Sequence, residues 1–197
     1  MPSPIRIRSD ELLSHNWGKL RKLTFDITRR DGTVETQVRE VYDRGNGAAI
    51  LPVDPERGTV LLVRQFRMPV HFNGHDGYLI EACAGLLDDL DAEAAIRKEA
   101  EEELGYRLGR IEQVFEAYTS PGSVTERLVF FIAVYSPADR ISEGGGDAHE
   151  GEDIEVIEIP LEEALTMIPT GEIVDAKTIM LLQHAKLAGL ASTRAGG

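Results

Sequence analysis

Residues 91–104 constrain the fold more than any other part of the chain. The segment is rich in Ala, Glu, Arg, Lys and Leu and contains neither Gly nor Pro, which predicts a helix. Gly105 stands where helices often end in a glycine. The segments before and after it have the composition of strands. A helix between strands indicates a layered α/β or α+β domain with a mixed sheet.

The remaining elements of this domain follow from short apolar runs and the turn residues between them. The expected strands are 48–53, 59–66, 79–83, 111–119, 124–135 and 154–159. Two further helices, 161–167 and 176–187, close the domain.

A smaller unit precedes this domain. Apolar and polar residues alternate before an Asp31-Gly32 turn, and a second alternating run follows over 33–42, which predicts a hairpin. With the stretch 5–8 this gives a three-stranded antiparallel sheet, too small to be stable alone, so we expect it to pack on a partner. The expected division is a sheet unit over 1–43, a second domain over 44–191 and a flexible tail over 192–197.

Charge and composition exclude several classes of protein. The chain of 197 residues has 21 Lys and Arg against 34 Asp and Glu, a net charge of -13, which disfavours nucleic acid as a partner. Its longest apolar stretch, 128–135, is far shorter than the ~20 residues that cross a membrane. The first residues lack the apolar segment of a secretory signal, and the single Cys83 cannot form an internal disulfide, so we expect a cytoplasmic protein without a membrane partner.

The acidic end of the central helix has two possible explanations. Glu99, Glu102 and Glu103 stand at i, i+3 and i+4, so their side chains are expected on one helical face, where like charges repel. The face could be solvated, which helix geometry alone favours by about two to one. It could instead bind a hard cation such as Mg²⁺, which would replace the repulsion by coordination.

The residues before the helix favour the cation site. A strand ending near Glu81, a loop at Gly85, the helix and Gly105 together resemble the Nudix box, the Mg²⁺-binding loop and helix of hydrolases of nucleoside diphosphates linked to another group. The positions that match the second half of the family pattern are Glu99, Ala100, Glu102, Glu103 and Gly105. The first half differs, with Asp91 in place of a Glu and Lys98 in place of an Arg.

The resemblance covers nearly the whole chain and is closest to the GDP-mannose hydrolases of the Nudix superfamily, through the blocks 39–47, 63–67, 83–88, 96–100, 120–126 and 152–156. It implies a Nudix α/β/α sandwich, an N-terminal sheet exchanged in a homodimer, and cleavage of GDP-mannose to GMP and mannose 1-phosphate with Mg²⁺, or Mn²⁺ as a substitute. The implied metal ligands are Glu99, Glu103, Glu152 and the backbone carbonyl of Ala84. The implied substrate-binding residues are Trp17, Val38, Arg39, Glu40, Arg67, Ala84, Gly85, Leu86, Glu126 and Lys177. The implied catalytic residues are Glu103 and one proton-accepting carboxylate among Glu126, Glu150 and Glu152, a choice that stays open.

Other interpretations stay open beside this one. Arg39 and Glu40 could be cross-strand partners, and Arg67 an ordinary surface residue. Cys83, inside an apolar strand, is expected to pack rather than to act as a nucleophile. The alternative functions are hydrolysis of ADP-ribose or another ADP-sugar, and a module that holds Mg²⁺ and a nucleotide sugar without turnover.

Overall fold

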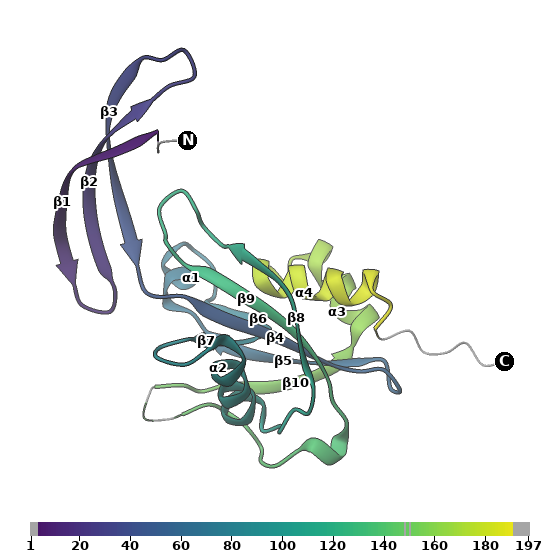
Figure 1. Cartoon of the computed structure of the whole chain (residues 1–197). Helices are drawn as coiled ribbons and strands as arrows, with labels where there is room; N and C mark the ends of the chain where they lie inside the picture. Colours follow the sequence, from purple (N-terminus) through teal and green to yellow (C-terminus); the bar gives the residue numbers. More distant parts are fainter. Residues whose placement is uncertain (1–3, 148, 150, 191–197) are drawn as a thin grey trace. The chain divides into compact units, whose positions relative to one another are not determined.

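The computed structural model describes residues 4–147, 149 and 151–190 (Figure 1). The chain divides into two compact units, of which the first is Met1–Asn46 with Tyr118–Arg127 and the second is Gly47–Ala117 with Leu128–Gly197. We expected a boundary near residue 44 and expected residues 118–127 in the second domain. These residues group with the first unit because Tyr42 is hydrogen-bonded on both sides, from its amide to Ser123 O (2.8 Å) and from the Thr125 amide to its carbonyl (3.0 Å). The expected tail, 192–197, lies outside the described residues.

The first unit contains an antiparallel sheet of β1 (Ile5–His15), β2 (Lys19–Thr28) and β3 (Val34–Asp43), in that order. The hairpin turn forms as expected: Gly32 has a φ of 85°, and Asp31 Oδ1 accepts a hydrogen bond from the Thr33 amide (2.9 Å). β1 extends beyond the expected 5–8. The part of β1 beyond residue 8 is joined to β2 by a bidentate ion pair between Asp10 and Arg21, a cross-strand contact of the kind that stabilises sheets.

The second unit is built on a mixed seven-stranded sheet. Its order is β10-β5-β4-β9-β8, with β6 beside β5 and β7 beside β4. β4 and β9 are parallel, and β4 is antiparallel to β5 and β7. The strands are β4 (Gly47–Asp54), β5 (Thr59–Phe66), β6 (Tyr78–Glu81), β7 (Cys83–Leu86), β8 (Ile111–Tyr118), β9 (Arg127–Val134) and β10 (Glu155–Pro160).

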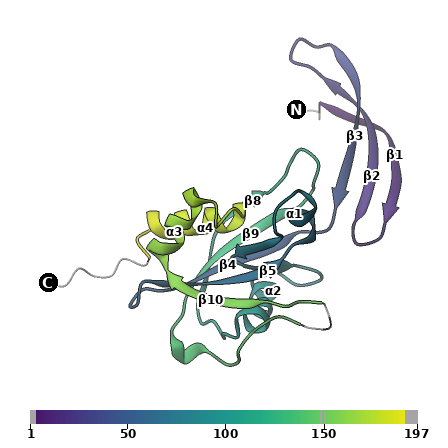
Figure 2. The same cartoon turned by 180° about the vertical axis from the view of Figure 1, so that it is seen from behind.

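Helices cover both faces of this sheet (Figures 1 and 2). On one face lies α2 (Ala92–Glu99), continued by a π-helix, η1 (Ala100–Leu104); on the other lie α3 (Leu161–Thr170) and α4 (Ala176–Leu187). Successive residues of β4 alternate between the two cores: Ile50 packs in the cluster that contains Ile96, and Leu51 in the cluster that contains Leu181. The mixed-sheet α/β/α sandwich is confirmed.

Three local details differ from expectation. The expected strand 79–83 is two strands, because β6 pairs with β5 and β7 with β4. The last expected strand before residue 135 begins at Arg127, because Val124 pairs with Tyr42 of the first unit. The short helices α1 (Met68–Phe72) and η2 (Pro137–Asp139) were not expected; both begin beside a proline and are too short to show a helical period. In the described part of the chain, no helix combines the length and apolar character needed to cross a membrane.

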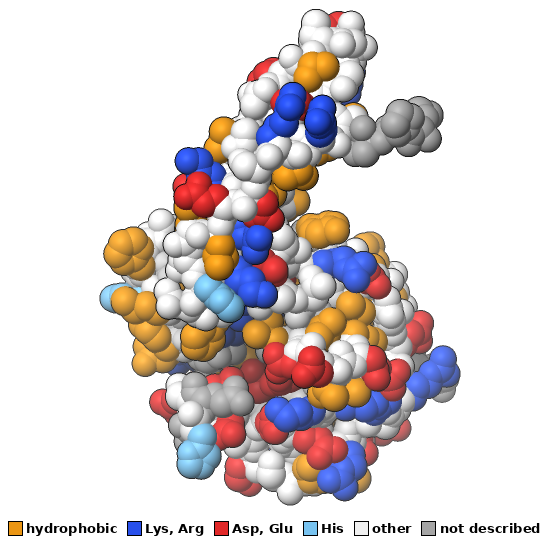
Figure 3. Space-filling view, turned by 60° about the vertical axis from the view of Figure 1, so that its left-hand side comes forward, with side chains coloured by type: hydrophobic (Ala, Val, Ile, Leu, Met, Phe, Trp, Pro, Cys, Tyr) orange, Lys and Arg blue, Asp and Glu red, His pale blue; other side chains and the backbone are white. Residues whose placement is uncertain are grey.

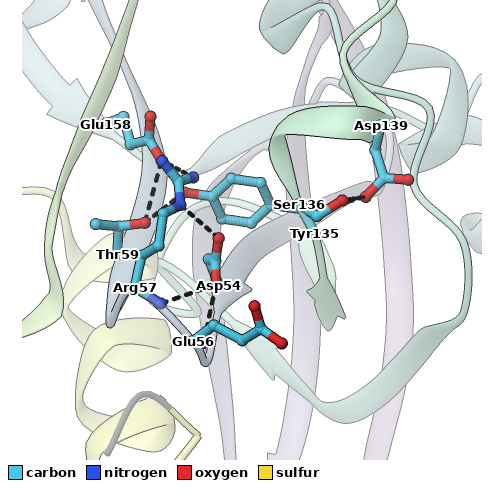
Figure 4. A network of polar contacts seen from close by, with 8 residues as sticks. All are labelled: Asp54, Glu56, Arg57, Thr59, Tyr135, Ser136, Asp139 and Glu158. Atoms are coloured by element: carbon cyan, nitrogen blue, oxygen red, sulfur yellow. Dashed lines mark hydrogen bonds and ion pairs between the residues drawn. The ribbon is translucent and has the colours of Figure 1, made fainter. Parts of the chain in front are cut away.

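A polar network fixes the end of the sheet at the β4–β5 turn (Figure 4). The buried Asp54 accepts hydrogen bonds from Arg57 Nε (2.6 Å) and the Glu56 amide (2.9 Å). Arg57 also pairs with Glu158 on β10, and Tyr135 donates its hydroxyl to the same carboxylate (2.7 Å). These contacts hold β10 against β5 without using any residue of the expected active site.

Candidate active site

The carboxylate of Glu99 lies directly against the backbone of Gly85. Glu99 is the last residue of α2, and Gly85 lies in β7. A Cβ placed on Gly85 would come closer than 3.0 Å to Oε1, Cδ and Cγ of Glu99, a separation that real Cβ atoms do not show. A side chain at position 85 would therefore force the Glu99 side chain to move, because β7 and α2 bring the carboxylate against the glycine.

Glu103 is a buried carboxylate. Only 2% of the residue is exposed, and its Oε2 accepts a hydrogen bond from the Ala84 amide (3.4 Å). Burial, together with the negative charges of Glu99 and Glu152, raises the pKa of Glu103 from 4.5 to about 7. A desolvated carboxylate under the influence of two further negative charges is an environment that a cation would stabilise.

Glu152 is positioned by a glycine loop. The Asp147 amide donates to Glu152 Oε2 (2.9 Å), and a Cβ on Gly146, whose φ is 78°, would clash with the same carboxylate. The loop is in turn bound to the end of η1: the Gly145 amide donates to Glu103 O (2.9 Å) and the Gly146 amide to Glu102 O (3.1 Å). Carbonyls that a helix end leaves unpaired thus hold the loop that carries Glu152.

Glu102 does not join the other two glutamates of its segment. It is exposed and pairs with Lys98 (Nζ to Oε2, 2.8 Å), whereas Glu103 is buried. We expected an α-helix to bring Glu99, Glu102 and Glu103 to one face, but residues 100–104 form a π-helix, whose wider turn changes the angles between side chains. π-helical turns are rare in proteins, and those that occur are frequently found at functional sites.

The donor set fits a hard divalent cation. Carboxylate oxygens and a backbone carbonyl are the ligands that Mg²⁺ and Mn²⁺ accept, and Ala84, whose carbonyl could be such a ligand, lies in β7. Among the described residues no three Asp, Glu, His or Cys side chains already surround one point as a complete metal site. The charge of a cation would draw Glu99, Glu103 and Glu152 together and favour the ionised form of Glu103.

Cys83 is buried and packs in the core, as expected. Burial and the neighbouring glutamates raise the pKa of its thiol well above 9.0, so the thiolate that a nucleophile needs is disfavoured.

Arg67 and Lys177 meet at a carboxylate that the sequence analysis missed. Glu81, at the end of β6, accepts hydrogen bonds from Arg67 Nε (2.8 Å) and from Lys177 Nζ (2.6 Å). The residue is 3% exposed. One signal could have found it: a carboxylate inside the apolar run 79–83 needs a cationic partner.

The other expected residues are distributed as follows. Trp17, Val38, Arg39, Glu40 and Glu126 belong to the first unit, Leu86 pairs with Gly47 in the second, and Glu150 lies outside the described residues. Trp17 is 81% exposed at the turn between β1 and β2. Arg39 donates along its own strand, to Val38 O (2.7 Å) and Gln37 Oε1 (2.9 Å), and Glu126 accepts from Thr119 Oγ1 (2.9 Å).

Acidic and basic side chains are mixed on one face of the molecule. On the face seen in Figure 3, Lys and Arg side chains lie beside Asp and Glu side chains, without a broad basic patch among the coloured, described residues.

Fold and site together define a class of enzyme. The glycine-to-glutamate loop and helix in an α/β/α sandwich is the arrangement of a Nudix hydrolase, and residues 43–182 match the family described as the NUDIX domain. The chain belongs to the Nudix family. Residues 4–42 match a second family, described as the GDP-mannose pyrophosphatase NudK N-terminal domain.

Curated relatives cover almost all of the chain and bear one name. The chain is 55% identical over 190 residues to the GDP-mannose pyrophosphatase of Pectobacterium atrosepticum, and the aligned region covers 96% of this chain and 97% of that protein. It is 54% identical over 187 residues to the GDP-mannose pyrophosphatase of Cronobacter sakazakii, with 94% of this chain and 97% of that protein aligned. It is 52% identical over 189 residues to the GDP-mannose pyrophosphatase of Klebsiella pneumoniae, with 95% of this chain and 94% of that protein aligned.

Proposed function

We propose that the enzyme hydrolyses the diphosphate of a nucleotide sugar with Mg²⁺, and that GDP-mannose, converted to GMP and mannose 1-phosphate, is its substrate. The observation that carries this proposal is Glu103, a buried carboxylate whose pKa is raised by burial and by the charges of Glu99 and Glu152. The shared name of the relatives supports the choice of substrate.

Each part of the site has a task in this reaction. Glu99, Glu103, Glu152 and the Ala84 carbonyl would hold Mg²⁺, which when bound would neutralise the diphosphate charge and polarise the phosphorus. Arg67 and Lys177 offer cationic donors to the diphosphate oxygens. One carboxylate accepts the proton of the attacking water, and Glu126, Glu150 and Glu152 stay as candidates.

We extend the proposal to the first unit. Its three-stranded sheet is exchanged in a homodimer, and Trp17, Val38, Arg39 and Glu40 contact the nucleotide sugar together with Ala84, Gly85, Leu86 and Glu126. The 81% exposure of Trp17 in a single chain supports a role in contact with another molecule. The lone and buried Cys83 fits a reducing compartment, which we infer to be the cytoplasm.

A panel of nucleotide sugars tests the function. The purified chain is incubated with GDP-mannose, GDP-glucose, ADP-ribose and ADP-glucose, with and without Mg²⁺, and the products are separated by ion-exchange chromatography. The highest kcat/KM is expected for GDP-mannose, with GMP as a product and no turnover in EDTA. A preference for the ADP compounds would favour the ADP-sugar alternative, and binding without turnover would favour the non-catalytic module.

A further inference from the structure

Glu81 is a buried carboxylate shared by two cations from distant parts of the chain. Its side chain is 4% exposed; one oxygen accepts from Arg67 at the end of β5 and the other from Lys177 in the first turn of α4. Charge-assisted hydrogen bonds in a desolvated place are strong and directional. Each of the two side chains is therefore held at one fixed oxygen.

The backbone around Glu81 is fixed to the same helix. The amide of Ala82, the next residue, donates to the buried Thr178 Oγ1 (2.7 Å), and this hydroxyl donates to Asp175 Oδ2 (2.6 Å). Asp175 is the N-cap of α4. The strand end and the helix start therefore form one hydrogen-bonded unit around the carboxylate.

The two cations differ in how far they are available to a ligand. Lys177 lies between Glu81 (2.6 Å) and Asp175 (3.1 Å), and its side chain is 13% exposed. The side chain of Arg67 is 38% exposed, and its contact with Glu81 uses Nε. A bond at Nε fixes the plane of a guanidinium and leaves the terminal Nη groups to bind a planar or phosphoryl anion.

This cluster is close in the chain to the expected metal site. Glu81 precedes Ala84 by three residues, so their Cα atoms are at most about 10 Å apart. We propose that Glu81 is a positioning residue that holds Arg67 and Lys177 in the orientation in which they bind the diphosphate, without touching the substrate itself. This inference rests on the proposed function of the site.

The test is Glu81→Gln, which keeps the shape of the side chain but can accept from only one cation. We expect KM for GDP-mannose to rise about tenfold or more, with kcat within about threefold of wild type, because a ground-state contact is disturbed. The Kd of GDP, measured by calorimetry, should weaken by the same factor. In an Arg67→Ala background, Glu81→Gln should raise KM by a much smaller factor than it does in wild type, because part of its effect on substrate binding acts through Arg67.

Glu158→Gln is the matched control, since Glu158 also pairs with an arginine on this sheet but lies in the Arg57 network of Figure 4. Its KM should equal that of wild type. The positioning role would be overturned if folded Glu81→Gln had unchanged KM and Kd. It would also be overturned if Glu81→Gln had the same effect on KM in the Arg67→Ala background as in wild type, or if Glu158→Gln raised KM equally. If Glu81→Gln does not fold, Glu81→Asp decides: one methylene shorter, it cannot reach both cations, so an unchanged KM refutes the role. A wild-type chain that neither turns over the panel nor binds GDP refutes the proposed function itself.

Discussion

The backbone carbonyl of Glu103 accepts a hydrogen bond from the Gly145 amide at 2.9 Å, which joins the end of the acidic helix to the glycine segment that precedes Glu152. The glycines of this loop are required by geometry. Gly144 has a φ of 70°, and a Cβ on it would come closer than 3.0 Å to Glu103 O. The two expected metal ligands therefore depend on each other through backbone contacts.

Gly144→Ala should separate the loop from the helix. The left-handed conformation alone costs about 1–2 kcal/mol for alanine, and the clash with Glu103 O adds to it. We expect a lower Tm and a Mg²⁺ concentration for half-maximal activity raised about tenfold or more. Gly171→Ala is the control, because its φ of 83° imposes the same strain but nothing lies within 4 Å of the added Cβ. Equal Mg²⁺ dependence in both variants would contradict the prediction.

Gly85→Ala should disturb the metal site directly. The added Cβ would overlap the Glu99 carboxylate, which must then move away from β7. We expect a loss of kcat of about 100-fold with a fold that circular dichroism shows to be intact. Gly109→Ala, where the Cβ meets nothing within 4 Å, should keep full activity. Normal turnover in Gly85→Ala would show that Glu99 is not a ligand at this place.

Glu103→Gln should lower kcat by about 100-fold or more and change how stability depends on pH. The pKa of Glu103 is raised in the folded protein from 4.5 to about 7, so between these values the folded state holds a proton that the unfolded state has lost. Metal-free wild type therefore loses stability as pH rises through this range, by up to about 3 kcal/mol. Urea unfolding in EDTA should show that the free energy of unfolding of Glu103→Gln does not fall in this way as pH rises. If the free energies of unfolding of wild type and Glu103→Gln changed in parallel from pH 4.5 to 8, the raised pKa of Glu103 would be refuted.

The homodimer is tested by the single tryptophan of the chain. Trp17 is 81% exposed in one chain. Light scattering should give twice the mass of 21.7 kDa, and GDP should quench Trp17 fluorescence if the indole stacks on the base. A fully active monomer at assay concentration would exclude the exchanged dimer.

The bond that breaks is tested in ¹⁸O-labelled water. Attack on phosphorus places the label in GMP or in mannose 1-phosphate, and both products keep a phosphate. A glycosidase would need two carboxyl groups about 5–9.5 Å apart across the anomeric carbon. Label on free mannose, with GDP released intact, would show attack on carbon and contradict the proposed mechanism.

The sequence predicts what depends on local spacing. The Asp31-Gly32 hairpin, the helix that ends at Gly105 and most strands of the larger sheet were expected, because each follows from residues that are close together or match a long motif. The bounds of α4 agree with expectation for the same reason.

What depends on tertiary contact was not predicted. Glu81 was missed because its partners are 14 and 96 residues away along the chain. The π-helix at 100–104 has the composition of an α-helix, and its wider turn becomes visible only through the Gly105 amide, which donates to the carbonyl of Ala100 five residues earlier. The grouping of residues 118–127 with the first unit likewise follows from backbone bonds to Tyr42 that no local pattern shows.

That grouping has a consequence for how such an enzyme is inherited. The chain passes between the two units three times, after residues 46, 117 and 127. A module attached by one terminal linker can be gained or lost in a single fusion or truncation, whereas part of this one is inserted between two strands of the catalytic sheet. Exchange of the terminal sheet for another would remove Tyr42, the backbone hydrogen-bond partner of Ser123 and Thr125, so we expect the terminal sheet and residues 118–127 to vary together.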